Sequence, residues 1–134
     1  MSVAGPPSPP EAALRLCASD ELAVGKARVC NLGRDREGRP LRALLLLDPL
    51  RQLYAYVDRC RHLPIPLDNA GKYLDDDGTH LICRTHGARY RLVDGMCIDG
   101  PCRGLGLWPL PVVFEGDQIV LRRDALEGLL QLLD

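Results

Sequence analysis

Apolar and polar residues alternate over short stretches along most of this chain, a pattern typical of half-buried β-strands. One stretch differs, because Leu41–Leu47 is apolar at every position except Arg42, which predicts a buried strand. Turn-forming Gly, Asp and Pro residues separate the stretches. The predicted strands of this part are 28–32, 41–47, 53–57, 80–82 and 89–93. Short strands at such spacing predict an all-β sandwich or barrel-like fold.

The C-terminal part adds a hairpin and a helix to this pattern. Pro109–Glu115 and Gln118–Arg122 flank a Gly-Asp turn and predict the hairpin. Leucines recur with helical spacing over 125–133, which predicts a short amphipathic helix. At the other end, residues 1–12 are rich in proline and predict a flexible leader. We therefore expect a leader (1–12), one domain (13–123) and a C-terminal helix (124–134).

Composition narrows the class of protein without naming an activity. A chain of 134 residues suits one domain with a single core, and 46% hydrophobic with 26% charged residues is ordinary for a globular protein. The net charge of −1 gives no indication of nucleic-acid binding or of an anionic membrane surface. No apolar run approaches the roughly 20 residues of a membrane span, and the first residues lack the pattern of a signal peptide. We expect a cytoplasmic protein with reduced thiols.

The candidate chemistry lies in two short motifs. Cys60 and His62 form C-x-H, and after twenty residues Cys83 and His86 form C-x-x-H. Each motif pairs one thiolate with one imidazole, which suits an asymmetric two-iron cluster with both cysteines on one iron and both histidines on the other. Zinc is the alternative, but zinc fingers pair cysteine with cysteine and histidine with histidine. The mixed pairs therefore favour an iron–sulfur cluster.

Together with Gly87, which follows the second motif, these residues resemble a Rieske [2Fe–2S] ferredoxin-type domain from about Leu14 to Arg123. The resemblance implies an antiparallel β-sandwich with a small cluster-binding subdomain at about 58–104. Two loops of that subdomain would hold one cluster per chain at the edge of the protein. The implied cluster ligands are Cys60, His62, Cys83 and His86.

The resemblance also implies residues around the cluster. Tyr90 matches an aromatic position near a ligand cysteine, and Gly100-Pro101 matches a proline loop that covers the cluster. Either position is also compatible with plain core packing or an ordinary turn. Arg61 and Arg84 stand inside the motifs, within a group of arginines beside the loops. Such a basic rim would steer an acidic redox partner, or it is an ordinary solvated face.

Three residues depart from the Rieske proteins of cytochrome bc complexes. Those proteins join their two cluster loops by a disulfide, whereas the matching positions here are Ile65 and Thr85. They also have a serine whose hydroxyl bonds a bridging sulfide, and the matching residue here is Ala88. Fewer hydrogen bonds to sulfur stabilise the reduced cluster less. We therefore predict a reduction potential near the low end of the Rieske range, about −150 mV.

Cys97 and Cys102 flank the proline loop. They are either a second redox-active pair or two small buried thiols, and the second interpretation is favoured because cysteine often packs as a small hydrophobe.

The function that these features favour is one-electron transfer from a flavoprotein reductase to an acceptor oxygenase or reductase. The chain has three histidines, so His80 alone remains outside the motifs. A Rieske oxygenase needs two further histidines and a carboxylate for its mononuclear iron, so we expect an electron-transfer protein rather than an enzyme. A small Rieske subunit of a multi-subunit oxidoreductase, as in nitrite reductases, stays open. A redox sensor is less favoured, because no segment resembles a DNA-binding or signalling element.

Overall fold

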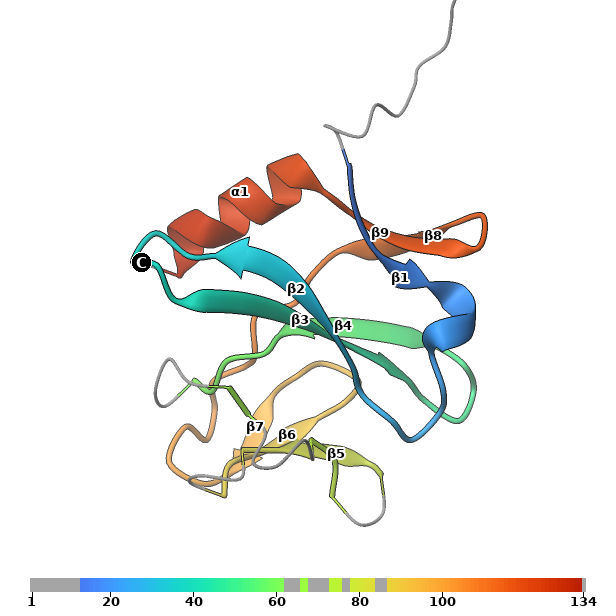
Figure 1. Cartoon of the computed structure of the whole chain (residues 1–134). Coiled ribbons are helices and arrows are strands. Elements are labelled where there is room, and N and C mark those ends of the chain that lie inside the picture. The colour runs from blue at the N-terminus through green and yellow to red at the C-terminus, as the bar shows by residue number, and fades with distance from the viewer. Residues whose placement is uncertain (1–12, 62–65, 68–72, 76–77, 84–86, 134) are drawn as a thin grey trace, which may run out of the picture.

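The computed structural model describes residues 13–61, 66–67, 73–75, 78–83 and 87–133. The predicted leader, residues 1–12, lies outside them. Within the described residues, nine strands form three antiparallel three-stranded sheets, and one helix follows the last strand (Figure 1). The predicted all-β fold with a short C-terminal helix is confirmed.

The elements fall into three sheets. The first has the order β1-β9-β8, the second β2-β3-β4 and the third β5-β6-β7. The strands are β1 (Ala13–Ala18), β2 (Arg28–Arg34), β3 (Pro40–Leu47), β4 (Leu53–Val57), β5 (His80–Ile82), β6 (Arg89–Arg91), β7 (Cys97–Asp99), β8 (Val112–Glu115) and β9 (Gln118–Arg122). A 3-10 turn, η2 (Ser19–Glu21), follows β1, and the helix α1 (Arg123–Leu132) follows β9.

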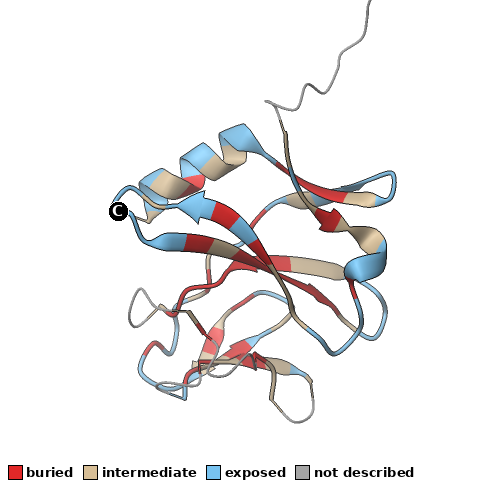
Figure 2. Ribbon diagram, viewed as in Figure 1, coloured by how far each residue is buried: buried red, intermediate tan, exposed pale blue. Residues whose placement is uncertain are grey.

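Strand β3 lies between two hydrophobic cores, which explains its continuous apolar run. Leu41, Ala43, Leu45 and Leu47 belong to a core shared with β1, β2, β4, β9 and α1, here called the base core. Leu44 and Leu46 belong to a second core, here called the tip core. The other buried members of the tip core are Tyr56, Cys60, Leu67, Tyr73, Leu81, Cys83, Ala88, Tyr90, Cys97, Cys102 and Leu107. Figure 2 shows buried segments in both parts of the molecule.

Strand β4 and the segment before β8 connect the two cores. The Val57 N–H donates to the Trp108 carbonyl at 2.9 Å, and the Leu110 N–H donates to the Ala55 carbonyl at 2.9 Å. The Tyr56 hydroxyl donates to the Leu92 carbonyl at 2.6 Å, which ties β4 to the turn after β6. The bond of Tyr56 links the β5–β7 sheet to the larger sheets, and the β5–β7 sheet lies at the end of the molecule opposite α1 (Figure 1).

Two strands were missed by the sequence patterns. Strand β1 pairs with β9, and β7 pairs with β6 inside the predicted proline-loop region. The last hairpin begins at Val112 rather than Pro109, because Tyr56 and Pro109 form only an isolated bridge. Among the described residues, no helix is long and apolar enough to cross a membrane.

Candidate metal centre

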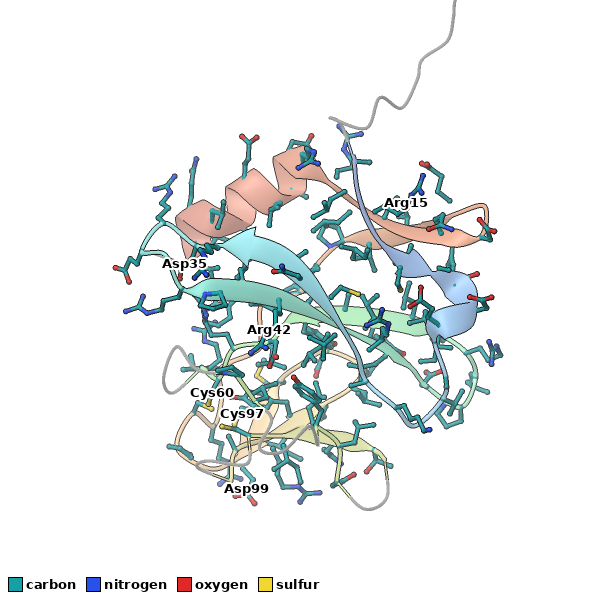
Figure 3. The ribbon with its side chains drawn as sticks, viewed as in Figure 1. Arg15, Asp35, Arg42, Cys60, Cys97 and Asp99 are labelled. Atoms are coloured by element: carbon teal, nitrogen blue, oxygen red, sulfur yellow. The ribbon has the colours of Figure 1, made fainter. Side chains whose placement is uncertain are left out.

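Two loops at the tip of the molecule carry the cysteines of the two motifs. Cys60 follows β4 and Cys83 follows β5, and the two residues are only 1% and 0% exposed. Both belong to the tip core, so the structure gathers the two sulfur-bearing candidate ligands into one buried group. Figure 3 shows Cys60 near Cys97, in the part of the molecule opposite α1.

The imidazole half of the predicted ligand set lies outside the described residues, since these include neither His62 nor His86. Arg84, Ile65 and Thr85 also lie outside them. Within the described part of the chain, no three His, Cys, Asp or Glu side chains are grouped so that they could hold a metal ion. That part supplies one buried cysteine from each loop, which fits the sulfur half of a histidine-ligated two-iron cluster.

Asp58, two residues before the first cysteine, anchors the first loop. Its side chain is completely buried, and its carboxylate accepts hydrogen bonds from the Leu67 N–H and the Tyr73 hydroxyl, both at 2.9 Å. The Arg42 guanidinium lies 3.7 Å away. Burying a carboxylate costs free energy unless it is paired in this way. Asp58 thereby connects the start of the first loop to Leu67 and Tyr73. The sequence patterns did not single it out.

Arg59 is a second buried charge beside the first cysteine. Its guanidinium donates to the Asp35 carboxylate at 3.0 Å, and both side chains are only 6% exposed. Burial raises the pKa of Asp35, but hydrogen bonds from Arg39, Arg59 and Glu37 outweigh it and hold that pKa below its usual value. Arg59 is therefore part of the support of the loop and does not contribute to an exposed basic rim.

The second loop is closed by backbone hydrogen bonds on either side of residues 84–86. The Cys83 N–H donates to the Ala88 carbonyl at 2.8 Å, and the Gly87 N–H donates to the Cys83 carbonyl at 2.7 Å. Gly87 has a φ of 75°, which a glycine adopts without strain. The bonds fix Cys83, Gly87 and Ala88 relative to one another.

The proline loop packs directly on this second loop. A Cβ atom on Gly100 would lie 2.7 Å from the Cα atom of Ala88, and Gly100 has a φ of 101°. Only glycine therefore permits this approach. Pro101, the next residue, is exposed, whereas Ala88 is completely buried.

Tyr90 on β6 lies between the first loop and the proline loop. Its hydroxyl oxygen accepts a hydrogen bond from the Arg61 N–H at 3.1 Å. It also lies 3.5 Å from the Cys60 sulfur and 2.9 Å from the Cys102 sulfur. Burial, reinforced by the hydrogen bonds with both cysteines, raises the pKa of Tyr90. The phenol therefore keeps its proton at neutral pH, beside a candidate ligand.

Cys97 and Cys102 are both buried, and their sulfur atoms are 3.4 Å apart. The Cys97 thiol donates to the Asp99 carbonyl at 3.1 Å. Burial raises the pKa of Cys102 to about 11, so that it is a thiol at neutral pH. The sequence interpretation as two small buried thiols agrees with their burial but missed the contact of Cys102 with Tyr90. The only sequence signal was the position of Cys102 next to the proline loop.

The arginines beside the loops differ in their surroundings. The Arg61 guanidinium stacks 4.4 Å from the centre of the Trp108 ring and donates to the Gly106 carbonyl at 2.9 Å. Arg89 and Arg91 form ion pairs with Asp75 and Asp94, respectively. Arg103 in the proline-loop region is exposed. Several of the arginines that could form a basic rim are thus engaged with other residues of the protein, so the rim would contain fewer free arginines than the sequence suggested.

One buried cysteine in each of two neighbouring loops of a small β-sheet subdomain fits the cysteine half of a histidine-ligated iron–sulfur domain. The family model of the Rieske [2Fe–2S] domain matches residues 12–125, and the chain belongs to this family. Membership in the family implies a [2Fe–2S] cluster. No curated protein matches the chain.

Solved structures with the same fold include two ferredoxins. The ferredoxin of carbazole 1,9a-dioxygenase from Nocardioides aromaticivorans IC177 is 21% identical, with a TM-score of 0.63 over 82% of this chain and 96% of its own. A ferredoxin of Sphingomonas yanoikuyae B1 is 20% identical, with a TM-score of 0.58 over 81% of this chain and 96% of its own.

A terminal oxygenase also has this fold, but in only part of the oxygenase chain. The terminal oxygenase of carbazole 1,9a-dioxygenase from Nocardioides aromaticivorans IC177 is 22% identical, with a TM-score of 0.62. The match covers 83% of this chain but 30% of the oxygenase chain. At these identities the matches establish a common fold.

Proposed function

We propose that this protein is a one-electron carrier that takes electrons from a flavoprotein reductase and passes them to a terminal oxygenase. In this proposal Cys60 and Cys83 bind one iron of the cluster, and His62 and His86 bind the other. The cluster supplies reversible one-electron chemistry when bound. We also propose a cytoplasmic location, in which the thiols of Cys97 and Cys102 remain reduced.

The observation that carries the proposal is the burial of Cys60 and Cys83 in one core, at the ends of two loops that are separately anchored. Asp58 anchors the first loop, and the backbone bonds between Cys83 and Ala88 anchor the second. Anchors of this kind keep Cys60 and Cys83 in place in both oxidation states. A small reorganisation on reduction suits a protein whose task is rapid electron exchange.

The proposed acceptor is supported by the kind of protein that shares this fold. The two ferredoxins match over nearly their whole length, whereas the oxygenase matches over 30% of its length. One similar structure is described as a reduced complex between oxygenase and ferredoxin in carbazole 1,9a-dioxygenase. The fold of this chain thus corresponds to nearly the whole of the two ferredoxins, which supports the carrier.

The ligand assignment is tested by replacing each proposed ligand with alanine and measuring iron and acid-labile sulfide per chain. We expect Cys60→Ala, Cys83→Ala, His62→Ala and His86→Ala each to abolish cluster binding. The matched controls are Cys30→Ala, a buried cysteine of the base core, and His80→Ala. Both controls should retain the cluster. A ligand variant with full iron and sulfide content would contradict its assignment.

Electron transfer is tested with the intact protein, NADH, a flavoprotein ferredoxin reductase and the terminal oxygenase of carbazole 1,9a-dioxygenase. We expect the visible absorption to bleach when the reductase is added and to recover when the oxygenase and its substrate follow. The Cys60→Ala variant is the control for direct transfer between the enzymes. A loaded protein that neither reductase nor dithionite reduces would overturn the carrier proposal.

A further inference from the structure

Beyond the ligands themselves, the contacts around Tyr90 assign a role to Cys102. We propose that Cys102 is a positioning residue whose thiol directs the hydroxyl proton of Tyr90 onto the sulfur of Cys60. The inference rests on the proposed ligation of the cluster by Cys60. Neither cysteine of the proline-loop region belongs to the C-x-H or C-x-x-H motif.

The Tyr90 hydroxyl has more neighbours than it has protons. Tyr90 is completely buried, so bulk water does not compete for its hydroxyl. The oxygen has one proton to donate and two lone pairs to accept with, and the Arg61 N–H at 3.1 Å occupies one lone pair. The proton can then point to the Cys60 sulfur at 3.5 Å or to the Cys102 sulfur at 2.9 Å. Cys102 decides between these two directions.

The proton of Cys102 also has two possible acceptors, namely the Tyr90 oxygen at 2.9 Å and the Cys97 sulfur at 3.4 Å. Oxygen is the better acceptor, because a thiol sulfur accepts hydrogen bonds only weakly. Cys97 meanwhile uses its own proton on the Asp99 carbonyl. The Cys102 thiol therefore donates to Tyr90 and fills the second lone pair of its oxygen.

With both lone pairs filled, the Tyr90 proton has the Cys60 sulfur as its remaining acceptor. A sulfur that binds iron is a thiolate and carries negative charge, which makes it a strong, charge-assisted acceptor. The two bonds run in the same direction, from Cys102 to Tyr90 and from Tyr90 to Cys60, so each strengthens the other. No group in this chain of three is left without a partner.

This relay acts on the reduction potential. Reduction adds negative charge to the cluster, and a hydrogen bond to a ligand sulfur stabilises the more negative state. Without the Cys102 proton, the Tyr90 hydroxyl has a free lone pair and a second sulfur to choose, so its bond to Cys60 weakens. Cys102 thus raises the potential through the hydroxyl of Tyr90.

The test compares reduction potentials by protein-film voltammetry in a double-mutant cycle on the full-length protein. We expect Tyr90→Phe to lower the potential, and Cys102→Ala to lower it by a smaller amount. The double variant should match Tyr90→Phe, because Cys102 acts only through the hydroxyl. Additive shifts, or an unchanged potential in a fully loaded Cys102→Ala variant, would overturn the inference.

Two further variants separate hydrogen bonding from packing. Cys102→Ser retains a donor of similar shape, and we expect a potential equal to or above that of the native protein. Cys97→Ala removes the neighbouring thiol, which points to Asp99, and should leave the potential unchanged. Should Cys102→Ala fail to hold a cluster, the serine variant still decides, because a lower potential in it contradicts the relay.

The same samples distinguish failure of this inference from failure of the proposed function. The iron and sulfide content of the Cys60→Ala variant, compared with that of the native protein, tests the ligand assignment. Loss of the cluster in Cys60→Ala together with an unaltered potential in a loaded Cys102→Ala variant would overturn the relay alone. A loaded Cys60→Ala variant would overturn the ligand assignment, and the relay with it.

Discussion

Two buried side chains next to Cys60 anchor the first loop through partners that are far away in the sequence. Asp58 binds Leu67 and Tyr73, and Arg59 binds Asp35 across 24 positions. Buried charged pairs of this kind leave an uncompensated charge when one partner is removed. The geometry around Cys60 therefore depends on residues that carry no metal ligand themselves.

The Asp35–Arg59 pair predicts a pH dependence of stability. Because the folded protein lowers the pKa of Asp35, its ionised carboxylate stabilises the fold above the unfolded-state pKa of about 3.9. This contribution is lost as the pH falls through the lower folded-state pKa. We expect Asp35→Asn to be less stable than the native protein at pH 7, with a difference that shrinks under acid.

Urea unfolding of both proteins between neutral and acidic pH measures this difference. Glu115→Gln, at an exposed position of the last hairpin, is the control for loss of one negative charge. A stability difference between Asp35→Asn and the native protein that is independent of pH would contradict the role of the ionised carboxylate.

Replacing Ala88 by serine would add one hydrogen-bond donor beside the cluster and should change the reduction potential. The Rieske proteins of cytochrome bc complexes have a serine at the matching position, and its hydroxyl bonds a bridging sulfide. We expect Ala88→Ser to raise the potential by up to about 60 mV, which corresponds to about 1.4 kcal/mol for one electron. Voltammetry measures the shift. Ala88→Gly controls for altered packing, and an unchanged potential in a loaded serine variant would refute the prediction.

At the scale of the elements, the sequence predicted those strands whose pattern is local. The apolar run of β3 and the alternation in β4 and β9 were sufficient, and the two cysteine motifs lay in loops beside predicted strands. Strands β1 and β7 were missed, because a short strand is stabilised by its pairing with a distant partner rather than by its own pattern.

The supports of the candidate site were missed for a related reason. Asp35 and Arg59 are 24 residues apart, and Tyr90 and Cys102 are 12 residues apart. No spacing rule connects such pairs before the chain folds. The resemblance to Rieske domains did direct attention to Tyr90 and the proline loop, and the structure places Tyr90 beside Cys60.

The proline loop offers a test of element packing. Gly100→Ala would place a Cβ 2.7 Å from the Ala88 backbone, whereas Gly104→Ala would meet no atom within 4 Å. Both glycines have a positive φ, so each substitution costs about 1–2 kcal/mol of backbone strain. We expect Gly100→Ala to cost a further 1–3 kcal/mol, roughly the cost of overpacking.

Denaturant unfolding of the two glycine variants gives the comparison, with visible absorption as a second signal for cluster loss. Gly104→Ala serves as the matched control for the strain. Equal losses in the two variants would mean that the proline loop does not press on the second cysteine loop as the contact with Ala88 indicates.

In the whole molecule, the core that stabilises the larger sheets is distinct from the core that contains the candidate cluster ligands. The base core joins strands of the two larger sheets to α1, and the tip core holds both candidate ligand cysteines. Strand β3 contributes residues to both cores and so links them. A partner that docks at the tip would therefore meet the candidate centre without disturbing the larger sheets.

This arrangement predicts that a charge at the tip affects partner reactions more than the same charge at the base. Arg103 is exposed beside the proline loop, and Arg15 is exposed on β1 in the other part of the molecule (Figure 3). We expect Arg103→Glu to slow reduction by the flavoprotein reductase several-fold at low salt, with a smaller effect at high salt.

Arg15→Glu has the same net charge as the tip variant and should leave the rate close to that of the native protein. Stopped-flow absorption over a range of ionic strength compares the two. Equal rates for both variants would show that Arg103 takes no part in steering and that the arginines near the loops form an ordinary solvated surface.

Pulsed EPR of the dithionite-reduced full-length protein tests whether two cysteines and two histidines hold the cluster. We expect the signal of a reduced [2Fe–2S] cluster that is coupled to the nitrogen nuclei of two histidine ligands, and we expect the Cys60→Ala variant to lack this signal. A reduced cluster without nitrogen coupling from histidine, or a colourless protein that contains zinc, would contradict this ligand assignment.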